Sequence, residues 1–171
     1  GGQGPAATYA RDVNIGDDIS FYGPGPRRDV DQSLEEFIFI GDMTAFPAIR
    51  VQLELLVESD HKSPVEIILE AKAVEDFEYF KGLTSRENFN FRLIEGNFTA
   101  LGLLTALKEL ELSSSTSKSL WCAGERLAIN EIRSHLKQYP QISFMDKYTS
   151  SYWQCGYTQN EHSLLKKEDQ K

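Results

Sequence analysis

The stretch that decides the fold is Phe37-Ile38-Phe39-Ile40-Gly41-Asp42-Met43-Thr44-Ala45-Phe46-Pro47-Ala48-Ile49. It opens with a continuous apolar run, Phe37 to Ile40, which is typical of a strand buried on both faces of a sheet. Gly41 and Asp42 break this run, and apolar side chains then recur at helical spacing from Phe46 to Leu56. Pro47 falls in the first turn, where proline is tolerated, and Asp42 or Thr44 is a candidate cap. The stretch therefore predicts a buried strand, a tight turn and a helix.

The same alternation continues along the chain. Apolar and β-branched residues predict further strands at 65–69, 89–94, 120–123 and 141–145. A helix is predicted from Thr99 and another from Gly124-Glu125. The apolar faces of these helices are predicted to be Leu101, Leu104, Leu107 and Leu110 in the first, and Ala128, Ile132 and Leu136 in the second. This order predicts an α/β fold in which helices cover both faces of a parallel sheet.

The two ends of the chain differ from this central region. Residues 19–22 alternate between apolar and polar side chains as a strand does, and the Gly-Pro-Gly-Pro run at 23–26 ends the pattern. We predict an N-terminal piece at residues 1–26, a linker at 27–36, the α/β domain at 37–158 and a polar tail at 159–171.

Charge excludes several classes of partner. The chain of 171 residues holds 18 Lys and Arg against 26 Asp and Glu, a formal net charge of −8. Such a surface argues against nucleic acid or an anionic membrane as a partner, because phosphate groups require a basic face. No apolar run approaches the ~18 residues of a membrane span, and no signal peptide is recognisable. We expect a monomer in the cytoplasm.

Neither cysteine nor histidine forms a metal-binding pattern. The two cysteines, Cys122 and Cys155, lie among aromatic residues without regular spacing. His61, His135 and His162 are far apart in the sequence. We therefore expect no disulfide scaffold and no metal site.

Two loops are candidates for ligand binding. In a parallel sheet, ligands bind beyond the carboxyl ends of the strands, at the point where the strand order reverses. That rule selects residues 41–47 after the first strand and 123–125 after the fourth. Backbone N–H groups at a helix start favour an anion such as a pyrophosphate. For the first loop, the alternative is a plain turn capped by Thr44. When the two loops are considered together, ligand binding and plain turns are about equally favoured.

Other enzyme signatures are absent from the sequence. It has no Gly-Lys-Ser/Thr phosphate loop, no Gly-x-Gly-x-x-Gly fingerprint and no Gly-x-Ser-x-Gly elbow. The carboxylates between Glu70 and Glu78 are most simply a solvated strand end. Tyr152 and Trp153 pack in the core or form a flat platform for a ring, and the sequence leaves both open. We predict no catalytic acid, base or nucleophile.

Four stretches in order carry a resemblance. They are Gly4-Pro5-Ala6-Ala7-Thr8-Tyr9-Ala10; Gly16-Asp17 with Gly23-Pro24; Gly41 to Ala48; and Trp121 to Glu125, followed by Arg133, His135 and Leu136 and then by Ser151 to Gly156. Together they resemble the siderophore-interacting protein family, the flavin-dependent ferric-siderophore reductases of the ferredoxin–NADP reductase superfamily.

This resemblance implies a Rossmann-like NAD(P)H domain, with residues 1–26 a remnant of an FAD-binding β-barrel. It implies an oxidoreductase that passes electrons from NAD(P)H through FAD to a ferric siderophore and so releases iron(II). Lys147 or the lysines of the tail, Lys166, Lys167 and Lys171, are candidates to attract the anionic ferric chelate. The implied cofactor-binding residues are Gly41, Asp42, Thr44, Ala45 and Pro47 for the pyrophosphate, Ala123, Gly124 and Glu125 for the nicotinamide, Gly4, Pro5, Ala6, Ala7 and Thr8 for the FAD phosphates, and Tyr152 and Trp153 for the flavin ring.

The sequence also departs from the family pattern. Ala7 replaces a serine, Tyr9 a tryptophan, Ser151 a glycine and Gln154 a frequent arginine, and most of the flavin barrel is missing. Two alternatives therefore stay open. One is an NAD(P)H:flavin reductase or the reductase component of an oxygenase. The other is a nucleotide-binding fragment without FAD and without catalysis.

Overall fold

The computed structural model describes residues 4–20, 29–96, 98, 101–112, 115–140 and 144–168. Its centre is a five-stranded sheet in the order β3-β2-β1-β4-β5. Every neighbouring pair of strands is parallel. The strands are β1 (Glu36–Asp42), β2 (Val65–Ala71), β3 (Phe89–Glu95), β4 (Lys118–Glu125) and β5 (Phe144–Trp153). The predicted parallel α/β fold is confirmed.

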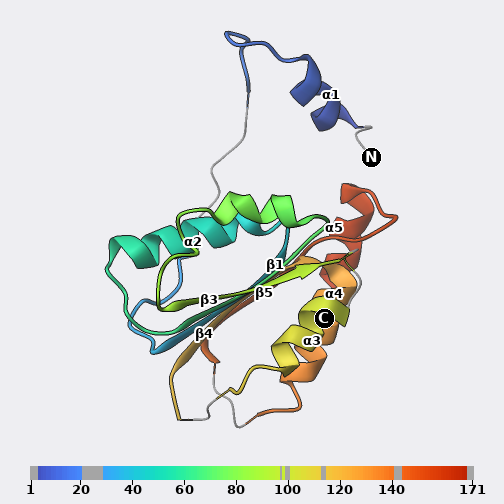
Figure 1. Cartoon of the computed structure of the whole chain (residues 1–171). Helices are drawn as coiled ribbons and strands as arrows, with labels where there is room; N and C mark the ends of the chain where they lie inside the picture. Colours follow the sequence, from blue (N-terminus) through green and yellow to red (C-terminus); the bar gives the residue numbers. More distant parts are fainter. Residues whose placement is uncertain are drawn as a thin grey trace.

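Helices cover both faces of the sheet (Figure 1). On one face lie α2 (Phe46–Glu58) and the short 3-10 helix η1 (Val74–Phe80), and on the other lie α3 (Leu101–Lys108) and α4 (Arg126–Leu136). The central position of β1 in the sheet explains why its apolar run is continuous. Phe37 and Phe39 pack in the core under α2, whereas Ile38 and Ile40 pack in the core under α3 and α4. Alternate side chains of a strand point to opposite faces, so a central strand needs apolar residues at every position.

Two details of the helices differ from prediction. Ala45 occupies the N-cap of α2 and makes no side-chain cap, so neither Asp42 nor Thr44 caps this helix. In α3, Leu101 is 68% exposed, while Leu103, Leu104 and Leu107 are buried. Of the predicted apolar face, Leu104 and Leu107 are confirmed and Leu110 packs against the same core, whereas the prediction for Leu101 is wrong.

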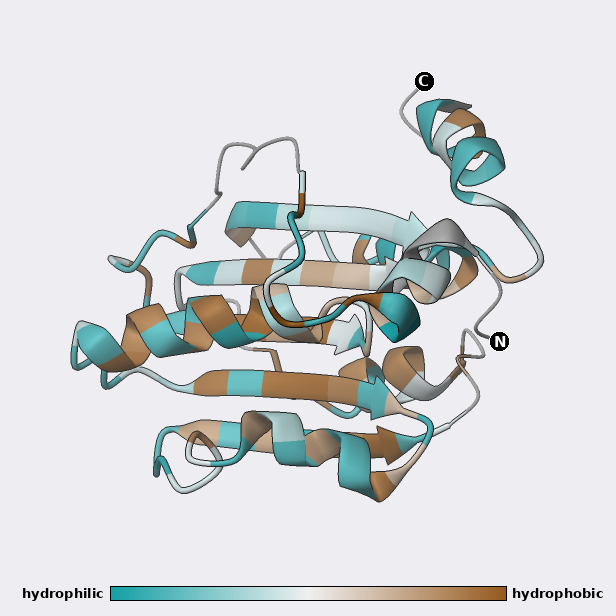
Figure 2. Cartoon of the chain, turned by 90° about the horizontal axis from the view of Figure 1, so that it is seen from above, coloured by the Kyte–Doolittle hydropathy of each residue, from teal (hydrophilic) through white to brown (hydrophobic). Residues whose placement is uncertain are grey.

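The last strand was predicted too early and too short. It runs from Phe144 to Trp153, whereas the pattern predicted a strand at 141–145, and residues 141–143 lie outside the described part. Figure 2 shows why: β5 is pale on the hydropathy scale, while β2, which has a neighbouring strand on each side, is strongly hydrophobic. An edge strand has a neighbour on one side only, so serine, threonine and tyrosine replace the aliphatic run that reveals a central strand.

The ends of the chain form two further helices. Residues Pro5–Asp12 form α1, and no strand occurs at 13–20; the remainder of the strand expected there lies outside the described residues. The polar tail contains α5 (Gln159–Glu168), in which His162 is 3% exposed. Within the described residues, no helix has the length and apolar character needed to cross a membrane.

Candidate functional site

One buried carboxylate joins three strand ends. Asp42, at the end of β1, is 1% exposed. Its Oδ2 accepts the backbone N–H of Glu125 at 2.7 Å and the indole N–H of Trp153 at 2.8 Å. Its Oδ1 accepts the N–H of Thr44 at 2.9 Å and the hydroxyl of Thr44 at 2.5 Å. Asp42 therefore holds the first residues after β1 against the ends of β4 and β5, at the point where the strand order reverses.

Both predicted glycines of the site are required by close packing. A Cβ on Gly124 would lie 2.6 Å from Asp42 Oδ2, and the backbone there has a φ of +155°. A Cβ on Gly41 would lie 2.7 Å from the Cβ of Ala45 and 3.0 Å from the carbonyl oxygen of Ala123. The space beside each glycine is filled by the protein itself. These glycines therefore allow strand, turn and helix to approach one another.

Glu125 caps the helix that follows β4. Its Oε2 accepts the N–H of Leu127 at 2.6 Å and that of Ala128 at 3.2 Å, and its side chain is 3% exposed. Its Oε1 accepts the N–H of Cys155 at 3.4 Å. A carboxylate at this position satisfies free N–H groups and complements the helix dipole. The acidic residue directly before a helical pattern was a readable signal for this cap.

The two aromatic residues predicted for the flavin ring point to different surroundings. Trp153 donates to Asp42 and meets the ring of Phe98 edge-on, with centroids 5.7 Å apart. Tyr152 meets Trp121 edge-on at 6.3 Å and packs against the core under α2. Burial raises the pKa of the Tyr152 hydroxyl. Trp153 therefore lies beside Asp42 at the carboxyl end of the sheet, while Tyr152 packs against the core.

Sequence reasoning missed Glu70, which it took as part of a solvated strand end. Glu70 closes β2 beside Asp42, is 2% exposed, and its Oε1 accepts the N–H of Phe98 at 2.9 Å. Burial raises the pKa of its carboxyl, and the charge of Asp42 adds to the rise. Asp42, Glu70 and Glu125 thus all turn inward and bind backbone N–H groups.

The surface of this edge is formed by other residues. Met43, Thr44 and Pro47 are exposed at the start of α2. The remaining predicted residues of the two loops, including Ala45 and Ala123, are buried. Gly4 is the N-cap of α1 and residues 5–8 lie in its first turns, where the N–H of Thr8 donates to the carbonyl of Gly4. The structure therefore brings the residues of the two predicted loops together at one edge.

Residues 34–156 match the sequence family described as siderophore-interacting protein. The chain belongs to this family. The match includes β1, β4 and β5 and therefore the whole of the edge organised by Asp42.

Solved structures of this kind share the fold. The siderophore-interacting protein SipS from Aeromonas hydrophila superposes with a TM-score of 0.80 at 22% identity, over 99% of this chain and 65% of that one. A siderophore-interacting protein from Acinetobacter baumannii gives 0.78 at 20% identity, over 98% and 65%. A siderophore utilization protein from T. fusca gives 0.68 at 22%, over 94% and 60%. The chain thus spans less than two thirds of the length of these relatives.

The exposed residues at this sheet edge of the siderophore-interacting protein come from the turn before α2 and from the start of α2. Met43, Thr44 and Pro47 are exposed there, and the ring of Trp153 is half-buried. Its loop N–H groups are less available than the sequence suggested, since Thr44 donates to Asp42 Oδ1 and Ala45 to the Asp42 carbonyl. The N–H groups of Thr44 and Ala45 are therefore already paired within the protein.

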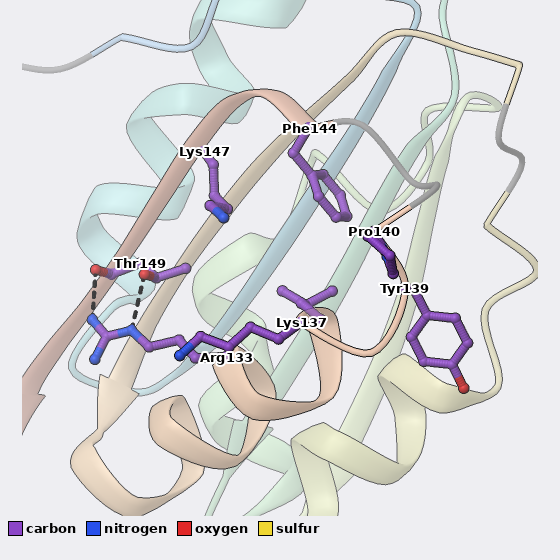
Figure 3. A pocket seen from close by; sticks show the side chains of 8 residues that line it. Arg133, Lys137, Tyr139, Pro140, Phe144, Lys147 and Thr149 are labelled. Atoms are coloured by element: carbon purple, nitrogen blue, oxygen red, sulfur yellow. Dashed lines mark hydrogen bonds between the residues drawn. The ribbon is translucent and has the colours of Figure 1, made fainter.

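Lys147 lies elsewhere. It is six residues before Trp153 on β5, roughly 20 Å away at the rise of a strand. It lines a groove between β5 and α4, together with Arg133 and Lys137 (Figure 3). The predicted contact of Lys147 with a ferric chelate stays a prediction.

Proposed function

We propose that this chain is the nicotinamide-binding part of an NAD(P)H- and FAD-dependent reductase that reduces ferric siderophores and so releases iron(II). The observation that carries this proposal is the carboxyl end of β1 and β4, where the strand order reverses and Asp42 accepts hydrogen bonds from Glu125 and Trp153. Membership of the siderophore-interacting family supports the substrate class. The hydride and the electrons are supplied by the bound cofactors, so the protein contributes binding and orientation.

In this proposal the chain's own residues act by position. Thr44 and Met43 contact the dinucleotide from the turn that precedes α2, with Pro47 in the first turn of that helix beside them. Trp153 offers its ring at the other side of the edge, and its orientation is fixed by the 2.8 Å hydrogen bond to Asp42. No residue has to gain or lose a proton, which agrees with the inward orientation of Asp42, Glu70 and Glu125.

The proposal is tested by titrating NADPH and NADH into the ¹⁵N-labelled chain. Amide signals of Met43 and Thr44 and the indole signal of Trp153 are expected to shift. Thr44→Glu places a negative charge on the exposed rim and is expected to weaken binding about tenfold or more. Thr105→Glu, on the exposed face of α3, is the matched control. Equal binding by both variants, or shifts confined to another surface, contradicts the nucleotide site.

The reductase activity is tested in the protein joined to its flavin-binding part. A yellow preparation that reduces a ferric chelate with NAD(P)H, followed by the absorbance of an iron(II) complex, is expected. Nucleotide binding without any such reduction would leave only the nucleotide-binding alternative.

A further inference from the structure

A cationic groove lies away from the sheet edge, between the last turn of α4 and the first half of β5 (Figure 3). Its volume is about 440 Å³, which is in the range of small-molecule sites. Of the eight residues that line it, Arg133, Lys137 and Lys147 are cationic and none is a carboxylate. In a chain with a net charge of −8, this local excess of positive charge is not explained by composition.

Two elements direct these cations to one place. Arg133, Leu136 and Lys137 are spaced i, i+3 and i+4 on α4 and therefore share one face of that helix. On β5, Met145 is an extra residue, because Lys118 pairs with Phe144 and the next residue, Ser119, pairs with Asp146. The bulge brings Phe144 to the same side as Lys147 and Thr149. In Figure 3 the Lys147 side chain projects from β5 into the groove, and the Lys137 side chain runs toward that of Arg133.

Arg133 is held rigidly in this groove. Its Nε donates to Thr149 Oγ1 at 3.0 Å, its Nη2 to the Thr149 carbonyl at 2.8 Å, and its Nη1 to Asn130 Oδ1 at 3.0 Å. These bonds use three of its five N–H groups and leave two for a ligand. A guanidinium fixed in advance loses little side-chain entropy when it binds an oxyanion.

A purely structural role accounts for only part of this arrangement. Arg133 and Lys137 at the end of α4 complement the helix dipole without any ligand. Lys147 comes from a different element and adds a third positive charge to the residues that line the groove. The groove is also lined by the apolar side chains of Leu136, Pro140 and Phe144.

We propose that this groove binds a small organic phosphate, with the phosphate between Arg133, Lys137 and Lys147 and the organic part against Leu136 and Phe144. This site is separate from the nucleotide edge proposed above and does not depend on that function. The groove is larger than inorganic phosphate needs, and its apolar wall favours a ligand with a flat or apolar portion.

The test is a titration of the full chain with AMP, ribose 5-phosphate and inorganic phosphate, followed by amide chemical shifts at constant ionic strength. AMP is expected to shift the signals of Leu136, Lys137 and Thr149 and to bind more tightly than the other two probes. The double variant Lys137→Gln/Lys147→Gln is expected to weaken AMP binding at the groove at least about tenfold, because two charge-assisted contacts are lost.

Three controls keep the result specific. Lys62→Gln/Lys81→Gln removes the same charge from exposed positions outside the groove and is expected to bind AMP as the wild type does. Lys147→Arg retains the charge and is expected to bind AMP more tightly than Lys147→Gln does. Thr44→Glu should leave the groove signals unchanged, which separates this site from the nucleotide edge.

Several results would overturn the proposal: AMP shifts confined to the β1–β4 edge, equal losses in the two double variants, ribose 5-phosphate binding as tightly as AMP, or a groove that takes up a ferric chelate and no organic phosphate.

Discussion

The sheet edge at Asp42 and the groove at Arg133 use charge in opposite ways. At the edge, Asp42, Glu70 and Glu125 are each at most 3% exposed and accept hydrogen bonds from backbone N–H groups. In the groove, Lys137 and Lys147 are exposed, and no carboxylate lines the space that they share with Arg133. Buried charges that accept several hydrogen bonds hold a structure together, whereas converging exposed charges of one sign favour a ligand of the other sign.

The largest effect is expected from crowding the edge. Gly124→Ala would put a methyl group 2.6 Å from Asp42 Oδ2, so Asp42 has to move and its bonds to Glu125 and Trp153 are lost. We expect the free energy of unfolding to fall by about 3 kcal/mol or more in urea denaturation. Gly4→Ala, with open space around the new methyl group, is the control and should change stability by a few tenths of a kcal/mol. Similar losses in both variants would show that the edge is not tightly packed.

A somewhat smaller loss is expected when Asp42 becomes uncharged. Asp42→Asn keeps the shape but replaces one accepting oxygen by a donor that faces the N–H groups of Glu125 and Trp153 or of Thr44. We expect a loss of about 2 kcal/mol in the free energy of unfolding, with altered Trp153 fluorescence. Asp60→Asn, at an exposed ion pair, is the control and should change stability little. An unchanged indole signal in Asp42→Asn would contradict the central role of this carboxylate.

Glu70 gives a pH-dependent contrast within the same edge. Its pKa in the folded chain lies above the ordinary 4.5, so folding binds a proton that the unfolded chain has already released. The stabilisation from that proton is fully present below the unfolded pKa and is lost as the pH rises through the folded pKa. Glu70→Gln removes this dependence and keeps an acceptor for the Phe98 N–H. Wild type is therefore expected to gain stability relative to Glu70→Gln as the pH is lowered toward 4.5. If the free energies of unfolding of the two proteins changed in parallel with pH, the raised pKa of Glu70 would be contradicted.

The smallest effect on stability is expected in the groove. Lys137→Gln/Lys147→Gln removes two exposed charges that approach a third, and we expect the free energy of unfolding to change by at most about 0.5 kcal/mol. The measurement is urea denaturation beside the variants of the edge. A loss as large as that of Asp42→Asn would mean that the groove cations serve the fold, and the contrast between the two regions would fail.

Much of the fold could be predicted from the sequence because local residue patterns encode it. Phe37 to Ile40 predicted a central strand, and both faces of β1 are indeed covered. The order of strands and helices predicted the point where the strand order reverses, between β1 and β4. The edge strand β5 was harder, because Ser150 and Ser151 are buried there without the aliphatic signature of a strand.

For the site, the sequence predicted which residues belong to it but not their contacts. Asp42, Gly124 and Trp153 were all selected, but as residues that would contact cofactors. Their mutual contacts depend on partners 83 and 111 residues apart, which no local pattern encodes. Glu70 was missed for the same reason, since its acceptor role toward Phe98 depends on the loop between β3 and α3.

The sequence by itself determined the strand–helix alternation, the continuous apolar character of β1 and the two loops at the reversal of strand order, because these follow from neighbouring residues and their periodicity. Only the tertiary structure decided which charges turn inward and which converge on a groove. Asp42 and Lys147 are both charged residues on strands, and their roles differ because burial and long-range partners, set by packing, determine what a charge can do.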